Sequence, residues 1–200
     1  MKFAKPTFIV FEGLDGSGKS TCAARLASLT DATLLTTPCV RVRRFRDELL
    51  DYLGPQQESR QLFYLATVFA ASESVRALLA EGTSVVLDRY FLSTQSYAAF
   101  RGSRLRVDEL SSLLTPADVT IYLDAHLDAR RARLERRATT AADLETLTVE
   151  ADAQLRREHL QRAQRSVVGQ FACVDGGGDD SDRVFARVVD ALASSGVVLV

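Results

Sequence analysis

Short apolar runs alternate with longer amphipathic stretches along this chain of 200 residues. A short apolar run bounded by polar or turn-forming residues is typical of a buried strand. Strands are predicted on this basis at 8–11, 32–37, 84–87, 119–123 and 171–174. Because helical stretches separate them, the pattern predicts an α/β fold with a five-stranded parallel sheet, helices on both faces and right-handed crossovers.

The helical stretches are bounded by glycine and proline, which end helices. Helices are predicted at 19–29, 42–53, 56–80, 92–100, 107–114, 126–137, 143–168 and 183–193. The stretch 56–80 is almost free of helix breakers and is apolar enough to be buried on more than one side. No linker, repeat or low-complexity segment divides the chain, so we expect a single domain over 1–200.

The first strand leads into a phosphate-binding motif. The residues from Gly13 to Ser20 fit the pattern G-x-x-x-x-G-K-[ST], in which glycines let backbone N–H groups form a cradle for phosphate. The helix that follows adds the positive end of its dipole. An ordinary glycine-rich turn is disfavoured, because the full pattern stands between a strand and an alanine-rich helix. The expected phosphate-binding residues are Gly13, Asp15, Gly16, Ser17, Gly18, Lys19, Ser20 and Thr21.

Composition narrows the class of protein further. The net charge of −1 provides no field that would attract nucleic acid or an anionic membrane, and we expect neither as a partner. The three cysteines have no spacing typical of zinc sites, and Cys22 and Cys173 are expected in the core. The N-terminus leads directly into a strand with no visible leader or membrane span, so a reducing cytoplasm is the expected compartment.

Polar residues follow the predicted strands at the edge where ligands bind in parallel sheets. Asp88 and Arg89 stand side by side at one such end, and Pro38 and Asp124 at two others. Asp88 can bind water molecules of the Mg²⁺ hydration shell, and Arg89 can make two parallel hydrogen bonds to a phosphate. A strand-end ion pair with no ligand is the alternative.

Residues 11–21, 88–90 and 92–97 together resemble the thymidylate kinase family of P-loop nucleoside monophosphate kinases. The resemblance extends over nearly the whole chain. It implies a P-loop NTPase fold with a helical lid at about 130–143, and transfer of a phosphoryl group from ATP, with Mg²⁺, to dTMP. It also implies a homodimer, for which the second and third helices are apolar enough.

The resemblance assigns roles to residues on both sides of the site. On the donor side, Lys19 would bind the phosphates of ATP and Ser20 the Mg²⁺ ion. Asp88 and Arg89 would lie at the acceptor phosphate and the metal. Asp15 would bind the sugar hydroxyl of the acceptor.

Two aromatic residues would complete the acceptor side. Phe63 would stack on the base and Tyr97 would pack near the sugar. For both, plain core packing is the alternative, because aromatic residues at helical spacing usually belong to a core.

Five arginines lie within eight residues on the predicted lid helix. Phosphoryl transfer requires positive charge on the migrating group, delivered by a lid that excludes water. Arg133 and Arg137 share a helix face and are the first candidates for this charge, followed by Arg136. A solvated helix crossed by ion pairs is the alternative for each of them.

The chain departs from the family on the side of the acceptor base. Thr67 stands where the family has the arginine that reads the base, and His159 where a tyrosine is usual. The family's Gly-Gly-Thr after Pro38 is also absent. Replacement contacts could come from Arg41, Arg43 or Arg44, although a surface basic run is the simpler interpretation of each.

Three hypotheses follow from these observations. The first is phosphoryl transfer from MgATP to a nucleoside monophosphate, with dTMP as acceptor. The second is a related kinase with another acceptor, such as a modified nucleotide or a nucleoside, for which Glu12, Asp15 or Asp88 is the candidate base. The third is a nucleotide-binding module that has lost catalysis.

Overall fold

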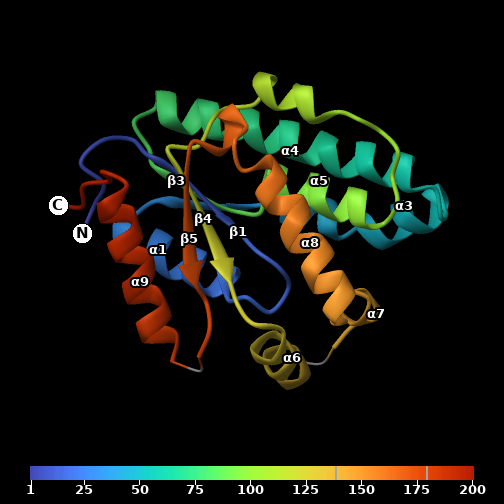
Figure 1. Cartoon of the computed structure of the whole chain (residues 1–200). Helices are drawn as coiled ribbons and strands as arrows, with labels where there is room; N and C mark the ends of the chain where they lie inside the picture. Colours follow the sequence, from blue (N-terminus) through green and yellow to red (C-terminus); the bar gives the residue numbers. More distant parts are fainter. Residues whose placement is uncertain (138, 179) are drawn as a thin grey trace.

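The sheet has five strands, all parallel, in the order β2-β3-β1-β4-β5 (Figure 1). The computed structural model describes residues 1–137, 139–178 and 180–200. The strands are β1 (Phe8–Glu12), β2 (Thr33–Thr36), β3 (Val85–Asp88), β4 (Val119–Asp124) and β5 (Gln170–Asp175). All five strands that the sequence predicts are therefore confirmed, with ends that shift by at most one residue.

Helices cover the two faces of the sheet, as the alternating pattern predicts. On one face, α1 and α9 pack on the side chains of Ile9, Phe11 and Ile121. On the other, α4 and α5 pack on Phe8 and Val10. The helices are α1 (Lys19–Thr30), α2 (Val40–Arg43), α3 (Arg46–Leu53), α4 (Gln57–Ala80), α5 (Phe91–Phe100), α6 (Leu127–Arg136), α7 (Ala141–Leu144), α8 (Val149–Arg162) and α9 (Ser181–Ser194), with 3₁₀ helices η1 (Asp108–Leu113) and η2 (Ser166–Val168).

Strand β1 lies at the centre of the sheet and fixes the position of the phosphate-binding loop. Its five residues are all buried: the first four are apolar on both faces of the sheet, and Glu12 is buried at the end of the strand. It pairs with β3 on one side and β4 on the other. The loops that follow these three strands therefore meet at one edge of the sheet.

Two predicted helices are wrong in their extent. The stretch 42–53 is divided between α2 and α3, and the side chain of Arg43, at the end of α2, donates to the Pro38 carbonyl. The stretch 143–168 contains the shorter α8, whose first turn is capped by the Thr148 hydroxyl accepting the Ala151 N–H. The expected lid range 130–143 includes residue 138, which lies outside the described residues.

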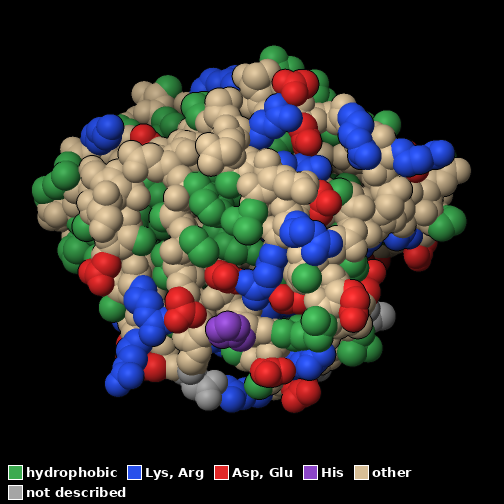
Figure 2. All heavy atoms as spheres, viewed as in Figure 1, with side chains coloured by type: hydrophobic (Ala, Val, Ile, Leu, Met, Phe, Trp, Pro, Cys, Tyr) green, Lys and Arg blue, Asp and Glu red, His purple; other side chains and the backbone are tan. Residues whose placement is uncertain are grey.

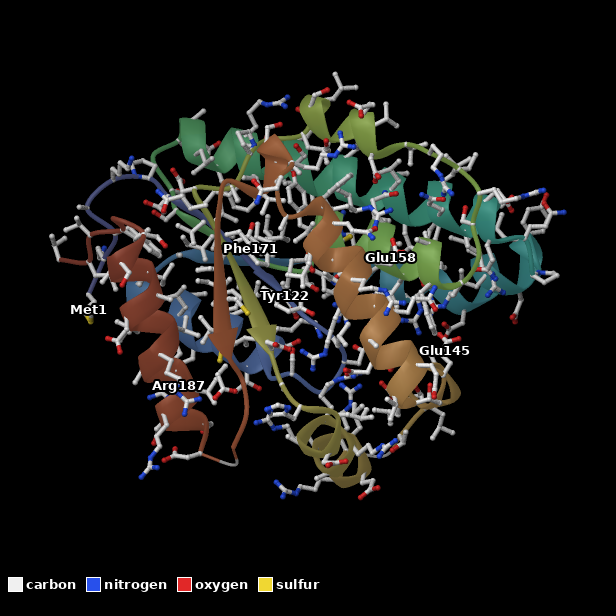
Figure 3. All side chains as sticks on the ribbon, viewed as in Figure 1. Met1, Tyr122, Glu145, Glu158, Phe171 and Arg187 are labelled. Atoms are coloured by element: carbon white, nitrogen blue, oxygen red, sulfur yellow. The ribbon has the colours of Figure 1, made fainter. Side chains whose placement is uncertain are left out.

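The prediction that Cys173 lies in the core is also wrong, since its side chain is exposed. Strand β5 is an edge strand of the sheet, and in Figure 1 it lies toward the viewer between α9 and α8. Hydrophobic side chains gather in the middle of the face turned toward the viewer (Figure 2). Beneath this face the buried ring of Tyr122 lies beside the partly buried ring of Phe171, with ring centroids 5.8 Å apart (Figure 3). Cys22, in contrast, is buried as predicted.

Helix α4 is the one described helix whose length and composition would allow it to cross a membrane. This is weak evidence, because a core helix of a globular enzyme passes the same test. Here Val68 and Val75 of α4 pack against the sheet in one of the two core clusters. That packing accounts for part of the apolar character of the helix, since 22% of its apolar window is buried.

Candidate active site

The loop between β1 and α1 bends at glycines that no other residue could replace without strain. Gly13, Gly16 and Gly18 all have positive φ angles, of 137°, 80° and 97°. A Cβ atom on Gly13 would lie 2.5 Å from the Leu123 carbonyl oxygen, and one on Gly16 would lie 2.9 Å from the Arg130 carbonyl oxygen. The loop therefore packs closely against the backbone at the end of β4 and against the backbone of α6.

Lys19 lies inside this loop rather than in solvent. Its side chain is 5% exposed, and its Nζ donates to the Leu14 carbonyl at 3.2 Å and lies 3.7 Å from Asp15 Oδ1. Burial lowers the pKa of Lys19 to about 8, with the positive charge of Arg89 acting in the same direction. An ammonium group held this way gains stability from any anion that enters the loop.

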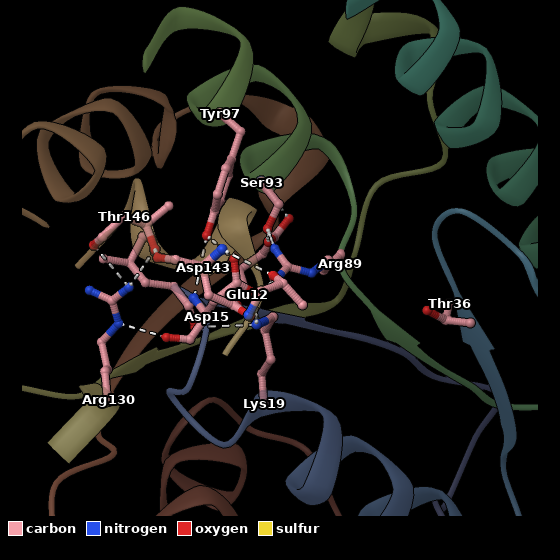
Figure 4. A network of polar contacts seen from close by, with 12 residues as sticks. Glu12, Asp15, Lys19, Thr36, Arg89, Ser93, Tyr97, Arg130, Asp143 and Thr146 are labelled. Atoms are coloured by element: carbon pink, nitrogen blue, oxygen red, sulfur yellow. Dashed lines mark hydrogen bonds and ion pairs between the residues drawn. The ribbon is translucent and has the colours of Figure 1, made fainter. Parts of the chain in front are cut away.

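Asp15, Arg89 and Tyr97 form one cluster beside the lysine (Figure 4). Arg89 Nη2 donates to Asp15 Oδ1, and the Tyr97 hydroxyl donates to Asp15 Oδ2 at 2.7 Å. Burial alone raises the pKa of Asp15, but the charges of Arg89 and Lys19 outweigh it and hold that pKa well below its usual range. Burial also raises the pKa of Tyr97, so its hydroxyl stays a donor. These three predicted residues thus form one charged, partly open surface.

Glu12 holds the segment that carries Arg89. Its carboxylate accepts the backbone N–H groups of Tyr90 at 2.9 Å and Ser93 at 3.1 Å, and the Ser93 hydroxyl. Burial raises the pKa of Glu12 against the effect of these hydrogen bonds. Arg89 itself has a φ of 69°, a left-handed conformation that is uncommon for residues other than glycine. The carboxylate therefore anchors an unusual turn in the backbone.

Asp88 and Ser20 were predicted as metal ligands. Asp88 is 8% exposed at the end of β3, and its Oδ1 has no hydrogen-bond partner among the described residues. Ser20 lies in the first turn of α1 with an exposed side chain. A buried carboxylate oxygen without a protein donor fits a Mg²⁺ ion with bound water, since hard oxygen ligands are what this ion prefers.

The two arginines predicted first behave differently. Arg133 reaches the loop, where Nη1 donates to the carbonyls of Gly16 at 3.2 Å and Ser17 at 3.1 Å. Its Nη2 donates to the Gly176 carbonyl at 2.8 Å. Arg137 instead pairs with Asp143 of α7 at 2.8 Å, and its side chain is 57% exposed. The structure thus brings Arg133 to the phosphate-binding loop and pairs Arg137 with α7.

The predicted base-binding residues lie on α4 and are less constrained. Phe63 is partly buried and packs on the ring of Tyr64, with centroids 5.1 Å apart. Thr67 uses its hydroxyl within the helix, donating to the Tyr64 carbonyl at 2.7 Å. Pro38 is partly buried at the end of β2, and its carbonyl accepts from Arg43 at 3.0 Å.

Sequence reasoning missed two residues. Arg130 is completely buried and donates to the Asp15 carbonyl at 2.7 Å, whereas the sequence favours Arg133, Arg137 and Arg136 as the functional arginines. Glu12 was considered only as a base, whereas its hydrogen bonds make it an anchor. An acidic residue inside an otherwise apolar strand is the signal that could have identified this role.

Comparisons with known proteins agree with this geometry. The family model for thymidylate kinase matches residues 11–175. A probable thymidylate kinase of Metallosphaera sedula is 33% identical over 174 residues, covering 84% of this chain and 83% of the relative. A thymidylate kinase of Trichlorobacter lovleyi is 34% identical over 190 residues, covering 84% of this chain and 88% of the relative.

The fold also matches a solved structure. The thymidylate kinase of Candida albicans superposes with a TM-score of 0.76 at 20% identity, covering 98% of this chain and 96% of that one. At this identity the likeness shows the P-loop NTPase fold. With the matched family model and the two curated relatives, the chain belongs to the thymidylate kinase family.

Proposed function

We propose that this protein transfers the γ-phosphoryl group of ATP to dTMP, yielding ADP and dTDP. Membership of the thymidylate kinase family makes it a nucleoside monophosphate kinase. The proposal for this site rests on one observation, which is the direct contact between the phosphate-binding loop and the residue that follows β3. Asp15, which lies in the phosphate loop, is bound directly by Arg89 from the end of β3 and lies 3.7 Å from Lys19.

The donor phosphates would bind at the loop between β1 and α1. Its backbone N–H groups and the start of α1 attract anions, and Lys19 supplies a full positive charge. Because Lys19 and Arg89 are both close to Asp15, the lysine is held in place before the nucleotide arrives. Catalysis then consists of positioning and charge neutralisation.

The acceptor would lie against Asp15, Arg89 and Tyr97. Arg89 can fork onto the acceptor phosphate, and the Asp15 carboxylate, kept ionised, can accept a sugar hydroxyl. The Tyr97 hydroxyl already occupies one oxygen of Asp15 and limits the space beside the sugar. No base is required, because a phosphate that is ionised at neutral pH is already a nucleophile.

A Mg²⁺ ion would be held by the Ser20 hydroxyl and, through water, by Asp88. When bound, it neutralises charge that develops on the phosphates. Asp88 is suited to this by its unpartnered oxygen, and it lies next to Arg89, so the metal and the acceptor phosphate would be close neighbours.

A second candidate is a kinase of this type with a different acceptor. The observation that favours it is the state of Thr67, whose short side chain donates to its own helix and provides no charged donor for a base carbonyl. Arg43, one of the possible replacements, is turned back to Thr36 and Pro38. A pocket without a fixed donor discriminates poorly between bases.

The test is ADP release from MgATP with a panel of acceptors: dTMP, dUMP, dCMP, dAMP, dGMP and their ribose forms. The first proposal expects dTMP to give the highest kcat/KM. Activity confined to another acceptor would replace it with the second candidate. ATP binding without turnover on any acceptor would favour a non-catalytic module.

We also propose a cytoplasmic homodimer. Exposed apolar side chains lie on and beside α3 and α4, at Phe45, Leu49, Tyr52 and Leu62. Burial of such side chains in a second copy would remove apolar surface from water. The three free cysteines fit a reducing compartment. Light scattering tests the assembly, and a monomeric mass at micromolar concentration would contradict it.

A further inference from the structure

Arg130 is the most deeply buried charged side chain of the lid helix. It is 0% exposed, and its Nε donates to the carbonyl oxygen of Asp15 at 2.7 Å. Its Nη2 donates to the carbonyl and hydroxyl oxygens of Thr146, at 3.4 and 3.3 Å. In Figure 4 the guanidinium lies on the side of Asp15 opposite to Arg89. Arg130 therefore holds the backbone of the phosphate loop from its outer side.

The contact with a carbonyl has a consequence for the next amide. In a planar trans peptide, the carbonyl oxygen of one residue and the N–H of the next point in opposite directions. Since Arg130 holds the Asp15 carbonyl outward, the Gly16 N–H is turned to the inner side of the loop, where phosphate binds. The loop is packed directly on α6 here, because a Cβ on Gly16 would lie 3.2 Å from the Arg130 Cα.

Arg133 acts in the same way one turn along α6. Its Nη1 donates to the Ser17 carbonyl at 3.1 Å, which turns the Gly18 N–H inward by the same rule. The Ser17 N–H, which lies between these two amides, instead donates to the Leu14 carbonyl at 3.1 Å. Two lid arginines thus set two separate amides of the cradle.

The charge of Arg130 is compensated away from the loop. Asp152 of α8 accepts from Arg130 Nη1 at 2.5 Å and from Arg156 Nε at 2.6 Å. Arg156 also pairs with Asp124 and donates to the Ala125 carbonyl. Without Asp152 the Arg130 charge would be buried with only neutral partners, which is unfavourable. With it, the guanidinium keeps one orientation and the carbonyl contact is fixed.

We propose that Arg130 is a positioning residue of the phosphate cradle: it orients the Gly16 N–H toward the phosphates of ATP without touching the nucleotide. Arg133 does the same for the Gly18 N–H. This inference rests on the proposed binding of ATP at the loop. It assigns to the lid a function in forming the site before closure, in addition to any charge it supplies during transfer.

The direct test is the response of the two glycine amides to MgADP in ¹H–¹⁵N spectra. In the parent protein both amides should move strongly downfield as they donate to phosphate. In Arg130→Lys the Gly16 response should be largely lost while that of Gly18 remains, and Arg133→Lys should show the reverse. An unchanged Gly16 response in folded Arg130→Lys would overturn the proposal.

A second variant addresses the case in which Arg130→Lys fails to fold. Arg130→Met with Asp152→Leu removes both members of a buried ion pair, a change that folds can tolerate. Arg156 keeps Asp124 as its partner. The expected result is a loss of about tenfold in MgADP affinity, as removal of a charged hydrogen bond predicts.

The matched control is Arg131→Lys. Arg131 is the next residue on α6, and its guanidinium binds the Leu147 carbonyl instead of the loop. The affinity of the Arg131→Lys variant for MgADP should equal that of the parent protein. If the double variant bound MgADP as tightly as the parent, Arg130 would not position the cradle. If the parent itself showed no MgADP response, the proposed function would be wrong instead.

Discussion

The phosphate side of the site and the face of α4 proposed for the base are built differently. On the phosphate side, Lys19, Glu12 and Arg130 are buried and each makes hydrogen bonds to neighbouring segments. On α4, Phe63 and Thr67 are partly exposed, and neither contacts another segment through a hydrogen bond among those described. The proposed phosphate side is thus held by many contacts, and the face proposed for the base by few.

From this difference we expect the two sides to tolerate substitutions differently. A residue with several partners cannot be replaced without disturbing all of them, because contacts in one network are not additive. A residue that projects from one helix can be replaced alone. If α4 reads the base, as proposed, a substitution at position 67 is expected to change base discrimination and to leave the transfer machinery intact.

The largest expected effect comes from the phosphate side. Lys19→Ala removes the one charge that the loop places on the donor phosphates, and kcat should fall by roughly a thousandfold or more. Steady-state ADP release with saturating MgATP and dTMP measures this. Lys5→Ala, in the exposed N-terminal segment, is the matched control and should leave kcat unchanged. A Lys19→Ala variant with most of its activity would contradict the proposed mechanism.

Arg89→Lys is expected to have the next largest effect. Lysine keeps the charge but loses the planar fork that binds Asp15 and a phosphate together. The kcat/KM for the acceptor should fall about a hundredfold, whereas the KM for MgATP should change much less. Arg76→Lys, at an exposed ion pair on α4, serves as the control. An equal loss for both substrates would show that Arg89 does not belong to the acceptor side.

The two sides also differ in how far sequence predicts them. The glycine spacing and the apolar strand before it predict the loop from Gly13 to Ser20, because the backbone geometry requires those residue types. The pair Asp88 and Arg89 was likewise visible at a strand end. These features depend on local spacing, which a sequence shows directly.

What sequence could not predict depends on contacts between distant segments. Arg130 and Arg133 have the same residue type and lie one turn apart, yet one is fully buried and the other partly exposed. The difference comes from Asp152, 22 positions later, which provides the buried partner for Arg130. A pattern on one helix cannot show which arginine a later helix will meet.

The proposed role of α4 in base recognition can be tested by placing an arginine at position 67. Thr67→Arg should raise the ratio of kcat/KM for dTMP over dCMP by about tenfold, because a guanidinium favours the carbonyl of thymine over the amino group of cytosine. Ala66→Arg, on the exposed neighbouring position, adds the same charge without facing the base and should leave the ratio unchanged. If both variants shift the ratio equally, the effect is one of general charge. No shift in Thr67→Arg would mean that this face of α4 does not read the base.

The last prediction concerns how the stability of the fold, rather than its activity, depends on pH. His159 on α8 is 0% exposed, lies 6.3 Å from the ring of Tyr97, and its Nδ1 contacts the Leu155 carbonyl at 2.8 Å. Burial lowers the pKa of His159 to about 3, and the positive charges of Arg89, Lys19 and Arg162 also lower it. The unfolded chain takes up a proton as pH falls below about 6.5, whereas the folded protein does not do so until about pH 3. The stability from neutral His159 is therefore complete above pH 6.5 and is lost as pH falls.

Between pH 6.5 and 5 this linkage should remove about 1.5 to 2 kcal/mol from the free energy of unfolding, since each pH unit is worth ~1.4 kcal/mol at most. Denaturant titrations at several pH values measure it. Carboxylates that also titrate in this range contribute equally to parent and variant, so the difference between His159→Phe and the parent isolates the histidine. His159→Phe should show the flatter dependence, and His126→Gln, at an exposed histidine, should follow the parent. Equal slopes in all three proteins would mean that His159 takes up its proton in the folded state, and that the neutral ring beside Tyr97 is not a fixed part of the acceptor side.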